Sequence, residues 1–123
     1  MDNRSGSDVD EAGAAEVARS VLAAEGVESG ELGLVFVPVE ESRRLKREHL
    51  GIDEPTDALA FPIDGLEQLP AGLPRQLGDV VVCPQVVGTE WRRPLVHALL
   101  HLIGYDHGDQ MEAREALYAK EAG

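Results

Sequence analysis

Residues 77–107, LGDVVVCPQVVGTEWRRPLVHALLHLIGYDH, contain the features that decide the fold. The apolar, β-branched run at 77–83 has the length of a short strand. The stretch from Pro94 to Gly104 predicts a helix, because proline is tolerated in a first helical turn and glycine favours a helix end. A strand followed closely by a helix predicts a domain that contains both kinds of element.

The rest of the chain adds elements of both kinds on the amino-terminal side and one helix at the carboxyl end. Apolar runs predict two more strands, at 33–39 and 57–63, and the first of them reads as a buried strand. Helices are expected at 10–25, 40–50 and 109–121, with a helical turn starting at Pro84. Residues 1–8 are polar and are expected to form a disordered tail before a single domain at 9–123. The predicted fold is α+β (mixed α/β), a small domain with a short mixed sheet covered by helices.

Composition narrows the function classes. The 123 residues fit one domain, and the single cysteine, Cys83, allows no intrachain disulfide, which favours the cytoplasm. Eleven lysines and arginines against 23 aspartates and glutamates give a net charge of −12, which opposes nucleic-acid binding unless cations are concentrated locally. The longest apolar stretch is about half the roughly 20 residues of a membrane span, and no secretory signal is expected.

Three histidines form the strongest candidate site. His97 and His101 are four residues apart on one face of the predicted helix, and Gly104 permits a turn that brings His107 back toward them. Three protein ligands with an open fourth position for water are typical of a catalytic zinc ion. The sequence therefore predicts one Zn²⁺ whose bound water is the catalytic group. The alternative is that the first two histidines are partly buried polar residues among leucines.

Other residues are candidates for supporting roles around this metal. Asp106 and Asp79 are candidates to orient a ligand imidazole, although Asp106 reads equally as an ordinary turn carboxylate. Clustered cations would offset the acidic total, and the candidate RNA contacts are Arg75, Arg92 and Arg93. A second cluster, Arg43, Arg44, Lys46 and Arg47, could also contact RNA but reads equally as a solvated helix face.

The spacing HxxxHxxGxxH is also that of the metzincin proteases. Those enzymes carry a glutamate directly after the first histidine as general base, and this chain has Ala98 there. A metallopeptidase is therefore the weakest of the enzyme hypotheses.

The histidine motif HALLHLIGYDH (97–107) is preceded by PTDALAFPID (55–64) and LGDVVVCPQVV (77–87). Together these blocks resemble the YbeY family of bacterial metal-dependent endoribonucleases, which act in ribosomal RNA maturation. The resemblance implies that His97, His101 and His107 bind zinc and that Thr56 and Asp57 line the cleft. It also implies a mixed sheet with surrounding helices.

The chain departs from the family pattern at several places. Ala98 and Ala60 replace the usual glycine and serine, and Leu50 occupies the position where an arginine commonly precedes the Thr-Asp pair. The segment GTEWRRPLV before the first histidine is short, and the family's amino-terminal strand has no counterpart in the sequence pattern.

The leading hypothesis is a cytoplasmic, zinc-dependent, single-strand-type endoribonuclease. The resemblance implies that it matures the 3′ end of 16S ribosomal RNA and takes part in ribosome quality control. Its expected partners are ribosomal RNA, a small-subunit ribosomal protein and an assembly GTPase, with no DNA and no membrane. The alternative is a zinc-stabilised ribosome assembly factor with little or no catalysis.

Overall fold

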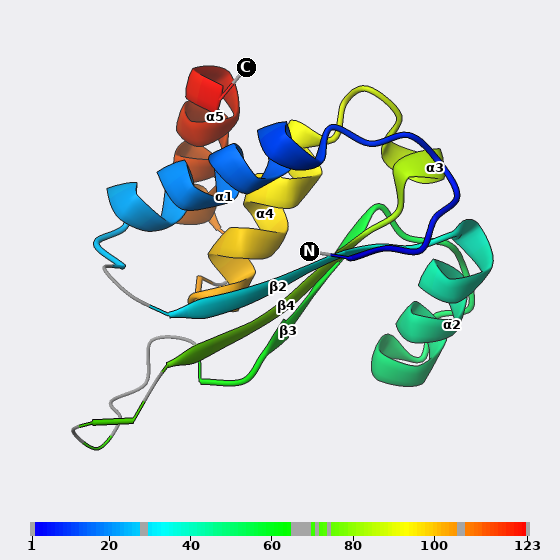
Figure 1. The fold of residues 1–123 in the computed structure, drawn as a ribbon, viewed down its shortest axis with the longest axis horizontal. Coiled ribbons are helices and arrows are strands. Elements are labelled where there is room, and N and C mark those ends of the chain that lie inside the picture. Colours follow the sequence, from blue (N-terminus) through cyan, green and yellow to red (C-terminus); the bar gives the residue numbers. More distant parts are fainter. Residues whose placement is uncertain are drawn as a thin grey trace.

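The computed structural model describes residues 2–27, 30–64, 70, 72, 73, 75–105 and 108–122, with the backbone alone for 119–122. The elements in chain order are β1 (Asp2–Asn3), α1 (Glu11–Ala24), β2 (Glu31–Phe36), α2 (Val39–Leu50), β3 (Ala58–Pro62), β4 (Gln76–Val82), α3 (Pro84–Val87), α4 (Arg92–Leu102) and α5 (Asp109–Ala122) (Figure 1). Within the described residues, no helix has the length and apolar character needed to cross a membrane.

The four strands form one mixed sheet in the order β1-β2-β4-β3. β2 and β4 run parallel, with Val35 opposite Val81, and β3 pairs antiparallel with β4. A parallel pair needs a crossover, and here α2 and β3 lie between β2 and β4 in the chain. The predicted α+β domain with a short mixed sheet and covering helices is confirmed.

The amino terminus differs from the expected disordered tail. Asp2 and Asn3 pair parallel with Val35 and Phe36, and the Arg4 amide donates to the Phe36 carbonyl at 2.7 Å. These backbone bonds add a short strand at the edge of β2, so an amino-terminal strand exists. A two-residue strand carries no apolar alternation, and sequence periodicity therefore has no signal for it.

The two faces of the sheet are covered differently. Figure 1 shows α1, α4 and α5 together on one side and α2 on the other. Because strand side chains alternate, Val80 and Val82 of β4 enter the large core beneath α1 and α4, whereas Val81 enters a smaller cluster with Val37 and Cys83. The larger core thus lies on the α4 side of the sheet.

α4 is the central helix of that core. It packs against α1, α5, β3 and β4, and six of its eleven residues are buried: Leu95, Val96, Ala98, Leu99, Leu100 and Leu102. Its end follows from Gly104, whose φ of 105° lies in the region that favours glycine. The amides of Gly104 and Tyr105 then donate back to the carbonyls of His101 and Leu100, which closes the helix.

Candidate active site

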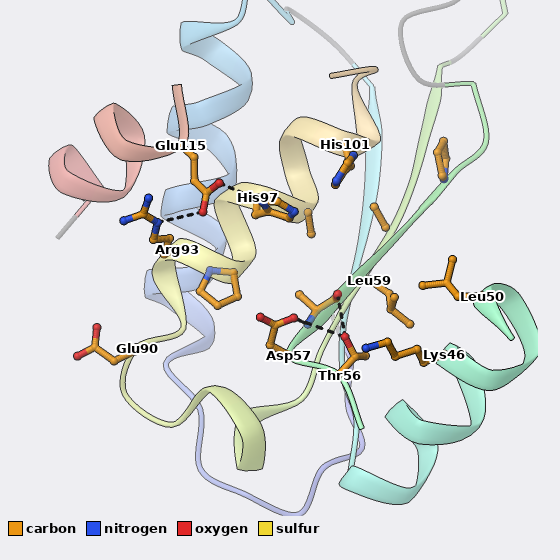
Figure 2. Close-up of a pocket in the computed structure, with 15 residues that line it drawn as sticks. Lys46, Leu50, Thr56, Asp57, Leu59, Glu90, Arg93, His97, His101 and Glu115 are labelled. Atoms are coloured by element: carbon orange, nitrogen blue, oxygen red, sulfur yellow. Dashed lines mark hydrogen bonds and ion pairs between the residues drawn. The ribbon is translucent and has the colours of Figure 1, made fainter. Parts of the chain in front are cut away.

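A pocket of about 920 Å³ opens between α4 and the segment formed by α2 and β3. Figure 2 shows His97 and His101 on the α4 wall, with Lys46, Leu50, Thr56 and Asp57 on the facing wall. The residues that line it are Lys46, Leu50, Thr56, Asp57, Ala58, Leu59, Ala60, Pro62, Glu90, Arg93, Pro94, His97, Ala98, His101 and Glu115.

The helical spacing brings His97 and His101 together as the sequence predicts. Their ring centroids lie 4.8 Å apart at an interplanar angle of 79°. His97 Nδ1 lies 2.9 Å from Glu115 Oε2. Because a carboxylate oxygen can only accept a hydrogen bond, Nδ1 carries the proton, and the neutral ring then has its lone pair on Nε2.

His101 adopts the same tautomer through a different partner. Its Nδ1 donates to the Tyr105 carbonyl oxygen at 3.0 Å, which again leaves the lone pair of the neutral ring on Nε2. Metal-binding histidines are typically held in this way, with one ring nitrogen donating to a carboxylate or a backbone carbonyl. The donor chemistry of this pair therefore fits a zinc ion.

The third predicted ligand, His107, and the predicted positioning residue Asp106 lie outside the described residues. Within the part of the chain that the structure describes, no group of three histidine, cysteine, aspartate or glutamate side chains is placed to hold a metal. The three-histidine zinc site remains a prediction, and two of its members line the same pocket.

Glu115 on α5 is the positioning residue that sequence reasoning missed. Its Oε2 accepts from His97, and its Oε1 accepts from Arg93 Nε at 3.0 Å (Figure 2). Burial disfavours the charged carboxylate, but the hydrogen bonds from His97 and Arg93 outweigh it, and the pKa of Glu115 falls below its ordinary value. Eighteen residues separate Glu115 from His97, so only the packing of α5 on α4 brings them together.

A second network holds the backbone segment that positions His101. The Tyr105 hydroxyl donates to Glu25 Oε1 at 2.5 Å, and the Tyr118 hydroxyl donates to the other oxygen of the same carboxylate. Arg114 Nη1 adds an ion pair to Glu25 at 3.5 Å. The hydrogen bond to Glu25 raises the pKa of Tyr105, and burial followed by the same carboxylate raises the pKa of Tyr118. Glu25, which caps the end of α1, and residues of α5 thereby fix Tyr105, whose carbonyl oxygen orients His101.

The Thr-Asp pair expected at the cleft lines the pocket. Asp57 Oδ1 accepts from the Ala58 amide at 2.6 Å, and the Thr56 hydroxyl donates to the Ala58 carbonyl at 3.4 Å (Figure 2). These local bonds start β3 and hold both side chains at the edge of the pocket.

Asp79 does not have the position that we expected for it. It is exposed on β4 and, by strand alternation, lies on the face opposite Val80, away from α4. Its carboxylate lies beside Gly33 of β2, where a Cβ atom would come within 1.9 Å of Oδ1. Asp79 therefore orients neither described histidine, and Glu115 does this for His97.

The three predicted arginine contacts separate in space. Arg93 lines the pocket, with its side chain 64% exposed. Arg92 packs over the Trp91 ring at 4.8 Å and lines a different hollow, of about 460 Å³. Arg75 precedes β4 and does not line the histidine pocket. Lys46 of α2, from the second cluster of candidate cations, does line it.

The chain is similar to known proteins. The family model described as Endoribonuclease YbeY matches residues 1–122. The chain belongs to the YbeY family. This membership places it among endoribonucleases, hydrolases that cleave RNA, and confirms the resemblance and the enzyme class expected from the sequence.

Curated relatives carry the same family name. "Endoribonuclease YbeY" of Halorhodospira halophila is 43% identical over 103 residues, which cover 75% of this chain and 66% of that protein. The protein of that name from Salinispora tropica is 36% identical over 140 aligned positions, which cover 98% of this chain and 88% of the relative. The solution structure of TM1509 from Thermotoga maritima superimposes with a TM-score of 0.57 at 22% identity, covering 99% of this chain and 89% of that one. This last similarity supports the fold.

Proposed function

We propose that this chain is a zinc-dependent endoribonuclease that cuts single-stranded RNA during maturation of the 3′ end of 16S ribosomal RNA. The observation that carries the proposal is the matched pair of imidazoles at the pocket. Both use Nδ1 to donate to an acceptor of the fold, through Glu115 for His97 and Tyr105 for His101. This leaves the same nitrogen, Nε2, as the ligand atom of each ring.

His97, His101 and the predicted third ligand, His107, would hold the zinc ion. When bound, zinc supplies Lewis-acid chemistry that polarises phosphate oxygens and activates water for attack on phosphorus. Glu115 keeps His97 in its ligand tautomer and raises the basicity of that imidazole. Tyr105 does the same for His101 through its carbonyl oxygen.

The pocket suits a nucleotide-sized group. A volume of about 920 Å³ falls within the roughly 300–1,000 Å³ of small-molecule sites. Arg93 lies at the same wall as His97 and shares Glu115 with it, so a guanidinium is held where a substrate phosphate would approach. Ala98 directly follows His97, and the general base that a metzincin protease would place there is absent from this position.

We place this activity in the cytoplasm and in ribosome quality control. Ribosomal RNA is the proposed substrate, and a small-subunit ribosomal protein and an assembly GTPase are the proposed partners, with no DNA and no membrane. The family membership supports the RNA substrate, and a single cysteine, Cys83, suits a reducing compartment.

The first test measures metal content and RNA cleavage together. Purified parent protein, His97→Ala, His101→Ala and His107→Ala are analysed for zinc and assayed on a structured ribosomal RNA with a single-stranded 3′ end. His49→Ala is the matched control, because His49 lies on α2 with its ring 4.6 Å from Phe61. We expect near-stoichiometric zinc in the parent and in the control, lost in the three site variants together with cleavage.

Two results would contradict the proposal in different ways. Zinc that is present in the parent and lost in the variants, without cleavage by any protein, would favour the zinc-stabilised assembly factor. A parent protein that holds no zinc would remove the metal site from both hypotheses.

A further inference from the structure

The histidine pocket carries one basic side chain on each of two facing walls. Among the described residues that line it, the lysine and arginine side chains are Lys46 on the α2 wall and Arg93 on the α4 wall, with His97 and His101 on the latter. Figure 2 shows Lys46 extending toward Thr56 and Arg93 lying beside Glu115. Asp57, Glu90 and Glu115 also line it, and Arg93 is paired with Glu115, so an RNA backbone that crosses the histidines would meet one cation on either side and carboxylates in the same pocket.

Position 50 offers no cation to the α2 wall. Leu50 lines the pocket with 57% of its surface exposed, and a leucine offers no donor to a phosphate. Lys46 lies four residues earlier on the same helix, so its side chain and Leu50 are neighbours on the helix surface.

The other cations of α2 face elsewhere. Arg43, Arg44 and Arg47 line a separate hollow with acidic residues of the same helix. Arg43 Nε lies 2.7 Å from Asp53 Oδ1, and Arg44 Nη2 lies 3.7 Å from Glu41 Oε1. Of these four basic residues, Lys46 is therefore the one whose position matches the histidine pocket.

Lys46 is well placed to exchange its present partner for a phosphate. Its side chain is 17% exposed, so its stem is packed, and Nζ lies 2.9 Å from Glu54 Oε1. Glu54 is 60% exposed and loses little by returning to water. An ammonium group with three donors on a flexible stem binds a phosphate oxygen as a point charge.

We propose that Lys46 binds a backbone phosphate of single-stranded RNA on the α2 wall, opposite Arg93. This inference rests on the proposed function, because it assumes that RNA crosses the pocket at His97 and His101.

The test measures how RNA affinity depends on salt. The probe is a short single-stranded RNA with 2′-O-methyl groups and phosphorothioate links, which resists cleavage, bound to the zinc-loaded protein. Lys46→Met removes the charge and keeps an unbranched stem, and Arg44→Met is the matched control on the same helix. Loss of one phosphate contact lowers the slope of log K against log salt by about 0.7 for single strands. We expect that decrease, together with a weaker affinity, in Lys46→Met alone.

Two further variants make the test specific for a phosphate contact. Lys46→Arg should keep the salt slope, because it keeps the charge. Adding Leu50→Arg to Lys46→Met should restore the slope, because it places a cation on the same part of the wall. Thermal unfolding of each variant checks that the fold is intact.

Distinct results would overturn the inference and the proposed function. If the parent binds and cuts RNA while Lys46→Met matches Arg44→Met in affinity and slope, the inference is wrong and the proposed function stands. If the parent neither binds nor cuts RNA, the proposed function fails, and the inference fails with it.

Discussion

The two walls of the histidine pocket are built in opposite ways. The α4 wall belongs to a helix whose Leu95, Leu99 and Leu100 are fully buried and which packs against four other elements. The α2 wall belongs to a helix with one buried residue, Ser42, covering a cluster of three buried side chains. One wall of the pocket is therefore formed by a helix packed in the core, and the other by a helix that lies mostly at the surface.

This difference separates two tasks. Metal ligands must be held within a few tenths of an ångström, and α4 would hold the proposed ligands His97 and His101 in this way because its backbone is fixed by the core. Contacts to an RNA backbone tolerate adjustment, and the lightly packed α2 would make the proposed contact at small energetic cost. We expect changes on the α4 wall to affect stability and metal binding and changes on the α2 wall to affect RNA affinity.

The largest expected effect comes from the core beneath α4. Leu99→Ala should lower the free energy of unfolding by about 2–5 kcal/mol, because it leaves a cavity among fully buried side chains. Leu45→Ala on α2 should lower the free energy of unfolding by clearly less, because Leu45 is only partly buried against the smaller cluster. Urea denaturation of both variants measures the difference, and equal losses would remove the distinction between the walls.

Next comes the carboxylate that orients His97. Glu115→Ala should weaken zinc binding by about 10–100-fold, the usual cost of losing a partner of a ligand imidazole. Zinc affinity measured by competition with a chelator tests this, with Glu112→Ala as the control on the exposed side of the same helix. Unchanged zinc affinity in Glu115→Ala would show that the His97 contact has no part in metal binding.

The tyrosine pair separates positioning from stability. Tyr105→Phe and Tyr118→Phe each remove a hydroxyl that donates to Glu25, so each should lower the free energy of unfolding by about 1.5 kcal/mol. Only residue 105 also presents its backbone carbonyl to His101. Tyr105→Phe keeps that carbonyl but loses the hydrogen bond to Glu25 that fixes the residue, so we expect zinc affinity to fall in Tyr105→Phe alone. Thermal unfolding and chelator competition on both variants check this, and parallel losses of zinc affinity would assign the network to stability only.

A pH dependence should follow from Glu115. Its pKa in the folded chain lies below the ordinary value of 4.5, so it releases its proton more readily when folded. The stability that it contributes is present above pH 4.5 and is lost as the pH falls through the lower, folded pKa. Zinc-free parent and Glu115→Gln should therefore differ in stability at pH 7 and converge on acidification; a constant difference would contradict this assignment.

The smallest expected effect is on the α2 wall. Leu50→Arg in the parent should change the free energy of unfolding by no more than about 0.5 kcal/mol, because residue 50 is exposed. It should tighten binding of single-stranded RNA by less than tenfold and steepen the salt dependence by about 0.7. Filter binding across a salt series measures both, and a loss of stability comparable to that of Leu99→Ala would mean that α2 is as firmly packed as α4.

Much of the architecture could be predicted from local sequence. The apolar run at 77–83, the helix carrying His97 and His101, and the glycine that ends it all appear in the structure within a few residues of their expected bounds. Each of these signals is local, since periodicity and helix ends depend on neighbours a few residues apart. The edge strand β1 and the side of the sheet that Asp79 occupies were missed, because both depend on strand pairing.

The sequence by itself determined the spacing of the two histidines on one helix face, the family to which the chain belongs and the alternation of helices and strands. Only the tertiary structure decided that Glu115 and Tyr105 orient those histidines and that Lys46, rather than the other cations of α2, lines their pocket. The physical reason is the separation along the chain between the residues that interact. Helical spacing follows from the geometry of one turn, whereas a carboxylate 18 residues away reaches an imidazole only after buried side chains have packed α5 against α4.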